Sequence, residues 1–373
     1  MAGIYIHIPF CKQACNYCNF HFSTQQKNIP SIVASIISEA AIRKDYISEK
    51  VDTIYFGGGT PSLLTELQIE NILFGLHKNF KTNEEIEITL EANPDDITEA
   101  KLQQWKKMGI NRLSIGVQSF AAADLHWMNR AHNDTMAIDS LHLATKYFDN
   151  ISIDLIYGTP TLTDAQWIEN MEQAIALNIS HLSCYALTVE PKTALQIMIE
   201  KEQVSDVDAD QQARHFELLL ATLESNGYEQ YEISNFAKPN FRSKHNSSYW
   251  QGKAYHGYGP SAHSYNGENI RRWNVANNSQ YIKSLKNDEL FHEIETLEPS
   301  QQFNEYVMTR LRTKEGVNLT EMKRLFGEEK VNHFMNDIIQ YIQSDKIISE
   351  ENHVRLTRVG MLYADGIAAA LFV

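Results

Sequence analysis

Residues 4–20 read IYIHIPFCKQACNYCNF and place three cysteines on one short loop behind a strand-like alternation. The spacing is C-x₃-C-x₂-C, formed by Cys11, Cys15 and Cys18. A closed structural zinc site needs four ligands, and no fourth ligand stands nearby at a suitable spacing. Three thiolates on a [4Fe–4S] cubane instead leave one iron open to an exogenous ligand. The loop therefore predicts a [4Fe–4S] cluster whose open iron chelates S-adenosylmethionine (SAM), with zinc as the alternative.

Strand-like and helix-like segments alternate along the chain on either side of this loop. Thr65 with Gln68 and Thr163 with Gln166 form capping boxes that open two of the helices. Six strand–helix units in sequence predict an α/β fold with right-handed crossovers, a partial (β/α)₆ barrel of the TIM-like type. The six predicted strands are Ile4–Ile8, Val51–Phe56, Ile86–Ala92, Arg112–Gln118, Ile151–Tyr157 and His181–Leu187.

The chain divides into three predicted parts. Residues 1–235 form the core barrel and end with a seventh short strand, Tyr231–Ser234. Residues 236–290 are rich in aromatic residues and have little periodicity, which predicts a connecting segment that closes the barrel. Residues 291–373 return to a helical pattern and predict a winged-helix-like module. Its elements are the helices Gln301–Arg312, Leu319–Phe326 and Glu328–Gln343 and the hairpin Ile347–Leu356.

The composition limits the classes of partner. Of 373 residues, 43% are apolar and 21% are charged, which is typical of a globular protein. The net charge of −14 argues against a nucleic-acid-binding surface and against an anionic-membrane surface. The N-terminal stretch lacks the features of a signal peptide, and no apolar run is long enough for an integral membrane segment. We therefore expect a cytoplasmic protein, in which clustered cysteines bind metal.

The ends of the predicted strands carry polar or small residues that should share one rim. In α/β barrels, functional groups gather at the carboxyl ends of the strands. The cysteines follow the first strand, and Gly57-Gly58-Gly59-Thr60 follows the second. Glu91, in position to accept ribose hydroxyls, ends the third. The other strands contribute Gln118, Asp154, Tyr185 and Ala186. The coincidence at six strands favours a ligand-binding rim over a set of ordinary solvated residues.

Several longer stretches resemble one known family and span most of residues 4–265. They are YIHIPFCKQACNYCNF, FGGGTPS, EANP, RLSIGVQSF, DLIYGTP, HLSCYALTVEPKT, YEISNFA, HNSSYW and GPSAHS. The sequence resembles the radical-SAM superfamily, and specifically the branch related to anaerobic coproporphyrinogen III dehydrogenase. Within that branch it is most similar to a haem-chaperone family whose members carry the label "coproporphyrinogen oxidase-like".

The resemblance implies roles for residues at the matching positions. Cys11, Cys15 and Cys18 should hold the cluster. The residues implied around the SAM molecule are Tyr5 and Tyr17 near the cluster, Gly58, Gly59 and Thr60 at the methionine amino end, Glu91 at the ribose, and Gln118, Arg130, Asp154 and Ala186 along the rest of the site.

The resemblance also implies haem as cargo. His245, Tyr249 and Trp250 reproduce an H-N-x-x-Y-W signature that the family is thought to use for haem. An imidazole is a good axial ligand for haem iron, and aromatic rings stack on a porphyrin. The alternative is that this segment seals the open side of the barrel, with His245 hydrogen-bonded and with Trp250 and Trp273 as core residues. Cys184 is expected to be a small buried residue, and His263 could face the SAM or haem cavity.

Two departures from the dehydrogenase pattern separate the functional hypotheses. The dehydrogenase cysteine loop continues C-x₃-C-x₂-C-x-C, whereas Phe20 stands at the last position here, and only four residues precede Tyr5. Both features favour a haem chaperone that delivers haem to acceptor proteins such as respiratory enzymes. The alternative is an oxygen-independent coproporphyrinogen III dehydrogenase, a radical-SAM oxidative decarboxylase of porphyrin biosynthesis. A purely structural iron–sulfur protein is disfavoured by the intact rim.

Overall fold

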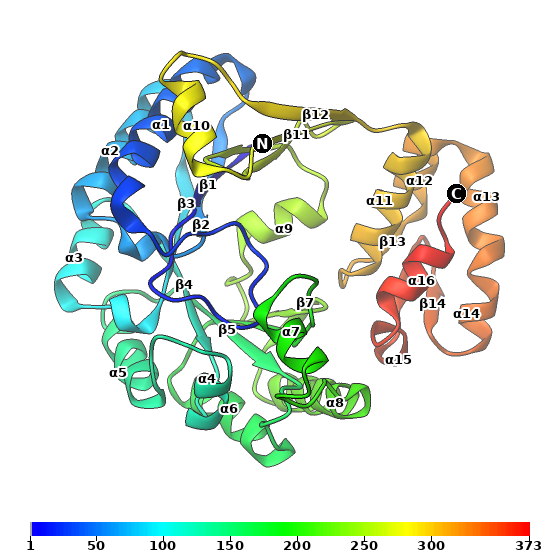
Figure 1. Ribbon diagram of the computed structural model, residues 1–373. Coiled ribbons are helices and arrows are strands. Elements are labelled where there is room, and N and C mark those ends of the chain that lie inside the picture. Colours follow the sequence, from blue (N-terminus) through cyan, green and yellow to red (C-terminus); the bar gives the residue numbers. More distant parts are fainter. Residues whose placement is uncertain (1) are drawn as a thin grey trace.

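Six parallel strands form a curved wall in chain order, and the computed structural model describes these and the rest of residues 2–373. Each strand pairs in parallel with the next one along the chain (Figure 1). The strands are β1 (Ala2–Ile8), β2 (Val51–Gly58), β3 (Thr82–Ala92), β4 (Arg112–Gln118), β5 (Ile151–Tyr157) and β6 (His181–Ala186). The predicted partial barrel is confirmed.

Helices cover the outer side of this wall (Figure 1). They are α1 (Ile29–Ile42), α2 (Glu66–Asn79), α3 (Glu99–Lys107), α5 (Asp134–Ala144), α6 (Asp164–Ala176) and α8 (Ala209–Ser225). The short helices α4 (Ala122–Trp127) and α7 (Ala194–Glu200) lie in the connections after β4 and β6. Both predicted capping boxes are present at the starts of α2 and α6.

The two faces of the wall differ in chemistry because side chains alternate along each strand. On β1, Ile4, Ile6 and Ile8 are fully buried against the helices. Tyr5 and His7, between them, point to the inner side of the wall. The outer face therefore forms the hydrophobic core, and the inner face is free to carry polar groups.

The predicted seventh strand is a hairpin instead. β7 (Glu229–Glu232) turns into β8 (Asn235–Ala237), and β8 pairs antiparallel with β6. The Glu232 carboxylate accepts hydrogen bonds from the Ser234 backbone and the Asn235 side chain, at 3.0 and 2.7 Å. These local bonds turn the chain within the stretch that had been predicted as one strand.

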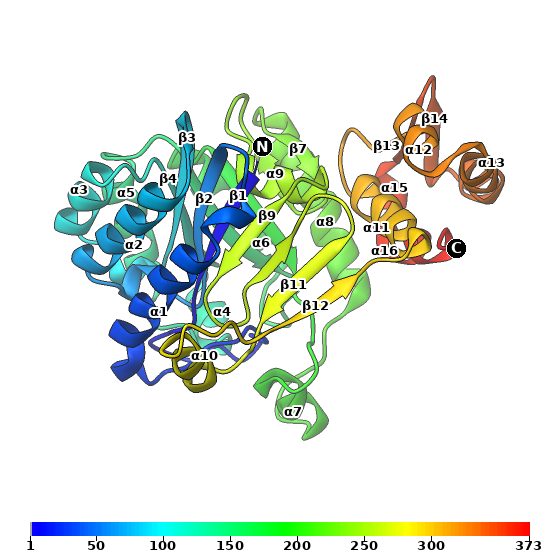
Figure 2. The same ribbon diagram turned by 90° about the horizontal axis from the view of Figure 1, so that it is seen from above.

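The aromatic-rich segment is more regular than its sequence indicates. After α9 (Lys244–Trp250), the strand β9 (Tyr255–Tyr258) pairs in parallel with β1. The next elements are β10 (His263–Tyr265), β11 (Ile270–Asn274), α10 (Asn278–Leu285) and β12 (His292–Thr296). The barrel therefore stays open, because β9 rather than β6 lies beside β1, and the sheet continues to β12 (Figure 2). The predicted boundaries at 235 and 290 cut this sheet, since β8 and β12 belong to it.

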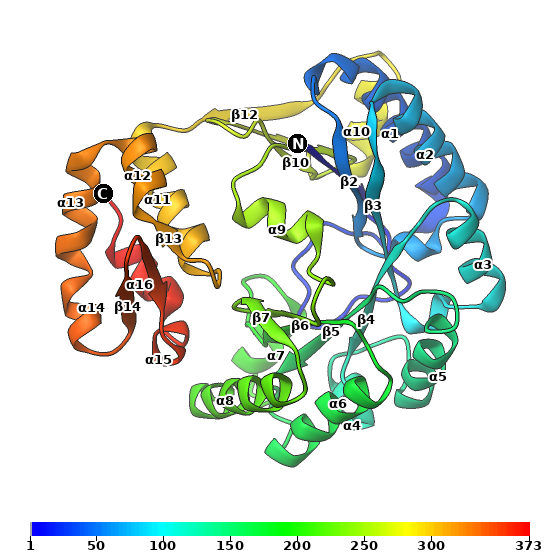
Figure 3. The same cartoon turned by 180° about the vertical axis from the view of Figure 1, so that it is seen from behind.

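The C-terminal module has its own core and stands beside the open barrel (Figure 3). Its elements are α11 (Pro299–Leu311), β13 (Val317–Asn318), α12 (Leu319–Phe326), α13 (Glu328–Asp337), α14 (Ile339–Gln343), β14 (Ile347–Glu350), β15 (His353–Leu356), α15 (Arg358–Met361) and α16 (Ala364–Ala370). The single helix predicted over 328–343 is two helices that meet at Ile338, which is fully buried. In residues 2–373, no helix combines the length and apolar character needed to cross a membrane.

Candidate SAM and cluster site

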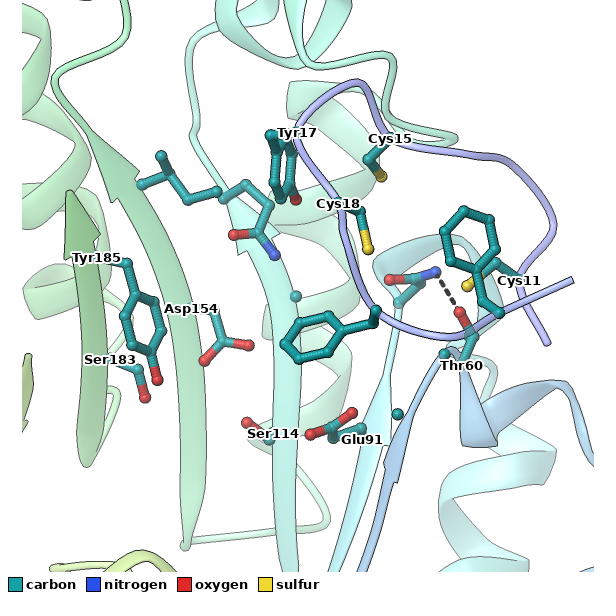
Figure 4. A pocket seen from close by; sticks show the side chains of 18 of the residues that line it. Cys11, Cys15, Tyr17, Cys18, Thr60, Glu91, Ser114, Asp154, Ser183 and Tyr185 are labelled. Carbon is teal, nitrogen blue, oxygen red and sulfur yellow. Dashed lines mark hydrogen bonds between the residues drawn. The ribbon is translucent and has the colours of Figure 1, made fainter. Parts of the chain in front are cut away.

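A cavity of about 480 Å³ lies on the inner side of the wall (Figure 4). This volume is within the range of small-molecule pockets, roughly 300–1,000 Å³. All six parallel strands or the loops that follow them contribute to its lining. Every residue predicted for the cluster and for SAM lines it: Cys11, Cys15, Cys18, Tyr5, Tyr17, Gly58, Gly59, Thr60, Glu91, Gln118, Arg130, Asp154 and Ala186.

The cysteine loop is held against the glycines that follow β2. The Thr60 backbone donates to the Phe10 carbonyl at 2.7 Å, and the Gly59 backbone donates to the Ile8 carbonyl at 2.9 Å. A Cβ on Gly59 would stand 2.5 Å from the Phe10 oxygen, so only glycine permits this approach. Gly58 has a φ of +107°, which also favours glycine. The glycine run thus fixes where the first cysteine stands.

The three cysteines are half-buried and face the same cavity (Figure 4). Among residues 2–373, no three His, Cys, Asp or Glu side chains converge closely enough to hold one metal ion. The three thiolates of a cubane each bind a different iron and so stand farther apart than the ligands of a single ion. Three thiols that face one cavity match the donor set of a [4Fe–4S] cluster with one open iron. Burial raises the pKa of Cys11 to about 11, so the protein alone does not favour its thiolate.

Arg130 connects the cysteine loop to strand β4. Its Nη1 lies 3.2 Å from the Cys15 Sγ, and its Nη2 donates to the Asn93 side chain at 2.9 Å and to the Gly116 carbonyl at 2.7 Å. Asn93 in turn donates to the Thr60 hydroxyl at 3.3 Å, the bond drawn in Figure 4. This network ties the cysteine loop to the loop after β3, the start of the loop after β2, and β4.

Two carboxyl groups face the cavity, Glu91 from β3 and Asp154 from β5, on either side of β4. The Tyr55 hydroxyl donates to Glu91 Oε1 at 2.7 Å. Burial, and less strongly the nearby Asp154 charge, raises the pKa of Glu91 to about 7 against the opposing effect of the Tyr55 hydrogen bond. Burial likewise raises the pKa of Asp154 to about 6. Carboxyl groups with such shifted pKa values, in a cavity, are typical of ligand sites.

The cavity also contains residues that the sequence analysis did not single out. Arg112 is almost fully buried, lines the cavity, and leaves its Nε and Nη2 without hydrogen-bond partners among the described residues. Ser114 and Ser183 lie on the same inner face (Figure 4). The inward alternation Arg112, Ser114, Gly116 along β4 was the signal that could have identified the first two.

The residues predicted to bind haem do not line this cavity. His245 is 1% exposed, with its ring stacked 5.0 Å from that of Tyr55. Its Nδ1 is hydrogen-bonded to the Thr53 hydroxyl at 2.7 Å and its Nε2 to the Tyr249 hydroxyl at 2.8 Å. Trp250 is half-buried and lies beneath the Arg312 guanidinium, 5.4 Å from the ring centre. His245 therefore matches the sealing alternative, whereas Trp250 and Trp273 are half-buried rather than core residues.

Two other residues of the prediction have clear positions. Cys184 is buried in β6, as predicted, whereas Cys11, Cys15 and Cys18 are half-buried. Phe20 is 67% exposed and lines the cavity mouth, where the dehydrogenase pattern has a cysteine.

Comparison with known proteins agrees with this architecture. The sequence pattern of the Radical SAM superfamily matches residues 5–174, and that of the HemN C-terminal domain matches residues 297–363. The solved coproporphyrinogen III oxidase (HemN) from Escherichia coli, described as a radical SAM enzyme, superposes with a TM-score of 0.85. That alignment covers 100% of this chain and 90% of HemN at 22% identity, so it shows the fold alone.

Curated relatives match over nearly the whole chain. The heme chaperone HemW of Bacillus subtilis is 32% identical, covering 99% of both chains. HemW of Lactococcus lactis is 32% identical over 95% of this chain and 93% of its own. HemW of Haemophilus influenzae is 32% identical over 97% and 95%. Membership of the radical-SAM superfamily implies a [4Fe–4S] cluster and SAM. The chain belongs to the HemW family of radical-SAM proteins.

Proposed function

We propose that this protein is a haem chaperone that binds a [4Fe–4S] cluster and SAM and transfers haem to acceptor proteins, such as respiratory enzymes. The match that carries the proposal is the near-full-length similarity to proteins named heme chaperone HemW. Phe20 supports it further, because the dehydrogenase pattern requires a cysteine at this position. The net charge of −14 is consistent with a protein rather than a nucleic acid as acceptor.

The cluster would be held by Cys11, Cys15 and Cys18, and its open iron would bind the amino and carboxylate groups of SAM. When bound and reduced, such a cluster can supply an electron to SAM. The chain's own residues then orient the ligand. Thr60 and the bare backbone at Gly58 and Gly59 line the place where the methionine end would lie, and the glycines leave room for it.

The Glu91 carboxyl, beside Gly58 in the same cavity, would bind the ribose hydroxyls. The Tyr55 hydroxyl and the Gly58 backbone N–H both donate to this carboxyl and fix its orientation. Asp154, Gln118 and Ala186 would line the rest of the SAM site, and Tyr17 would lie near the cluster. With a pKa of about 7, Glu91 is mostly protonated below neutral pH in the ligand-free protein, and hydrogen bonds from ribose hydroxyls would lower this pKa by stabilising the carboxylate.

The competing function is oxygen-independent coproporphyrinogen III dehydrogenase, favoured by the HemN-like fold. The two functions differ in a product that can be measured. We expect the anaerobically reconstituted protein, given SAM, a reductant and coproporphyrinogen, to form no protoporphyrinogen. The same preparation, loaded with haem, should pass it to an apo-cytochrome, followed by the Soret band of the acceptor. Multiple turnovers of decarboxylation would refute the chaperone proposal.

A further inference from the structure

The added strands β10 and β11 carry an imidazole that the cavity does not use. His263 is exposed and lies directly opposite Trp273 in the antiparallel pair. The two rings stack with centroids 5.9 Å apart and planes inclined by 21°. Among residues 2–373, neither ring nitrogen of His263 has a hydrogen-bond partner. The ring is thus fixed in direction while both of its nitrogens stay available.

Neighbouring imidazoles on the inner side of the sheet are different. His245 is buried, with Thr53 on one ring nitrogen and Tyr249 on the other. His7 is also buried, bonded to the Tyr5 hydroxyl at 3.3 Å and to the His21 carbonyl at 3.0 Å. Iron could bind a ring nitrogen of His245 or His7 only after an existing hydrogen bond had been broken. His263 presents no such cost.

Aromatic side chains surround His263 on the same side of the sheet. Tyr265, two residues along β10, lies opposite Tyr255 and Arg271, and the two tyrosine rings are 6.4 Å apart. We call His263, Tyr255, Tyr265, Arg271 and Trp273 the β10–β11 face. Alternation places the polar residues Ser264, Arg272 and Asn274 on the opposite, buried side.

The charges around this face argue for a metal-centred apolar ligand rather than a simple anion. Arg271 donates to Glu305 at 2.8 Å, so its charge is partly compensated. Glu293 and Glu295 on β12 lie opposite Trp273 and Arg271. These carboxylates repel a small anion and would also repel haem propionates, so a propionate would have to lie toward Arg271. The imidazole and the flat aromatic surfaces suit the iron and the porphyrin ring.

We propose that His263 is the axial ligand of haem iron and that the porphyrin lies against the β10–β11 face. The inference rests on the proposed haem-chaperone function and moves the iron ligand away from His245. One lone pair of the neutral imidazole bonds the iron in place of a water molecule, so no oxidant or reductant is needed. Partial desolvation by its neighbours and the Arg271 charge lower the pKa of His263, which favours the neutral imidazole that can bind iron.

The geometry assigns separate roles to the neighbours. A porphyrin bound through the tip of an imidazole stands perpendicular to the imidazole plane. Trp273, nearly parallel to His263, then acts as a positioning residue that holds the imidazole upright rather than stacking on the porphyrin. Tyr255 and Tyr265 provide the surface beneath the porphyrin, and Arg271 keeps free N–H groups for one propionate.

Titration of the full-length, cluster-reconstituted protein with ferric haem tests the proposal, with optical and electron paramagnetic resonance spectra as readout. His263→Ala should lose the imidazole-ligated low-spin signal and weaken haem binding at least about tenfold. His263→Gly should regain that signal on adding free imidazole. His245→Ala should lower the melting temperature yet keep the wild-type haem spectrum. His77→Ala, which removes an exposed imidazole from the outer helix α2, is the matched surface control.

The outcomes distinguish the assignment of His263 as the haem ligand from the proposed chaperone function. Wild-type haem spectra in His263→Ala, together with loss of the low-spin signal in His245→Ala, would overturn the assignment and leave the chaperone function standing. Equal weakening in His77→Ala and His263→Ala would also overturn it, because it would indicate non-specific binding. If the wild-type protein failed to bind haem at all, both the assignment and the proposed function would fall.

Discussion

Helix α9 and the cavity that contains the three cysteines lie on the same inner side of the wall, but the hydrogen bonding of their polar side chains differs. In the cavity, Arg112 has two nitrogens without partners among the described residues, and the pKa values of Glu91 and Asp154 are raised. In α9, His245 uses both ring nitrogens and its backbone N–H donates to Glu87. Incomplete partnering marks a place for a ligand, whereas a completed network marks structure.

The largest expected effect comes from removing a cluster ligand. Each of Cys11→Ser, Cys15→Ser and Cys18→Ser should abolish or severely weaken cluster assembly, because three thiolates are the minimum that holds the cubane with one open iron. Iron and sulfide analysis after anaerobic reconstitution measures this. Cys184→Ser, which alters a buried thiol outside the cavity, is the control and should keep the wild-type iron content. Full iron and sulfide in Cys15→Ser would contradict the ligand assignment.

The next effect concerns the SAM affinity and the Glu91 carboxyl. Glu91→Ala should weaken SAM binding by about 1.5–3 kcal/mol, the usual contribution of a hydrogen bond to a charged group. Calorimetry on the reconstituted variant measures the affinity, and its iron content should stay at the wild-type level. Glu87→Ala is a useful comparison, since Glu87 lies on the same strand but supports α9. Wild-type SAM affinity in Glu91→Ala would remove β3 from the proposed site.

A smaller effect should appear in the pH dependence of stability. The folded-state pKa of Glu91, about 7, lies above its unfolded value near 4.5, so the folded state binds more protons between these pH values. The free energy of unfolding therefore falls as pH rises from about 4.5 to 7. Glu91→Gln should remove this loss. The free energy of unfolding of the SAM-free variant, measured relative to wild type, should therefore be higher at pH 8 than at pH 5 by on the order of 2 kcal/mol. Denaturant unfolding at both pH values measures it, and an unchanged difference would contradict the shifted pKa.

The sequence predicted the parts of the molecule that depend on local pattern. Strands β4 and β5 have the bounds predicted for them, and the capping boxes of α2 and α6 formed as expected. The cavity lining was also predictable, since strand ends in such a barrel meet at one rim. These features follow from alternation and from local hydrogen bonds.

The rest depended on contacts between distant segments. Strands β9 to β12 are three to five residues long, too short for alternation to identify, and they form because β1 offers a free edge. The hydrogen bonding of the His245 ring depends on Thr53 on β2, which is 192 residues away in sequence. His263 differs from His245 only in such surroundings, so residue type and motif could not distinguish the sealed imidazole from the open one.

The smallest effect tests the completed network of α9 directly. Tyr249→Phe removes the hydroxyl bonded to His245 Nε2 and leaves the ring contact with Tyr255, 4.6 Å between centroids, in place. One neutral hydrogen bond contributes about 0.5–1.5 kcal/mol, so the free energy of unfolding should fall by about that amount. The variant also leaves His245 Nε2 without its hydrogen bond. A haem titration of this variant is therefore a second test of which histidine binds the iron. If His245 were the iron ligand, removing its competitor would strengthen haem binding. If His263 is the ligand, haem affinity should stay unchanged while stability falls, and a tighter haem complex in Tyr249→Phe would return the iron to α9.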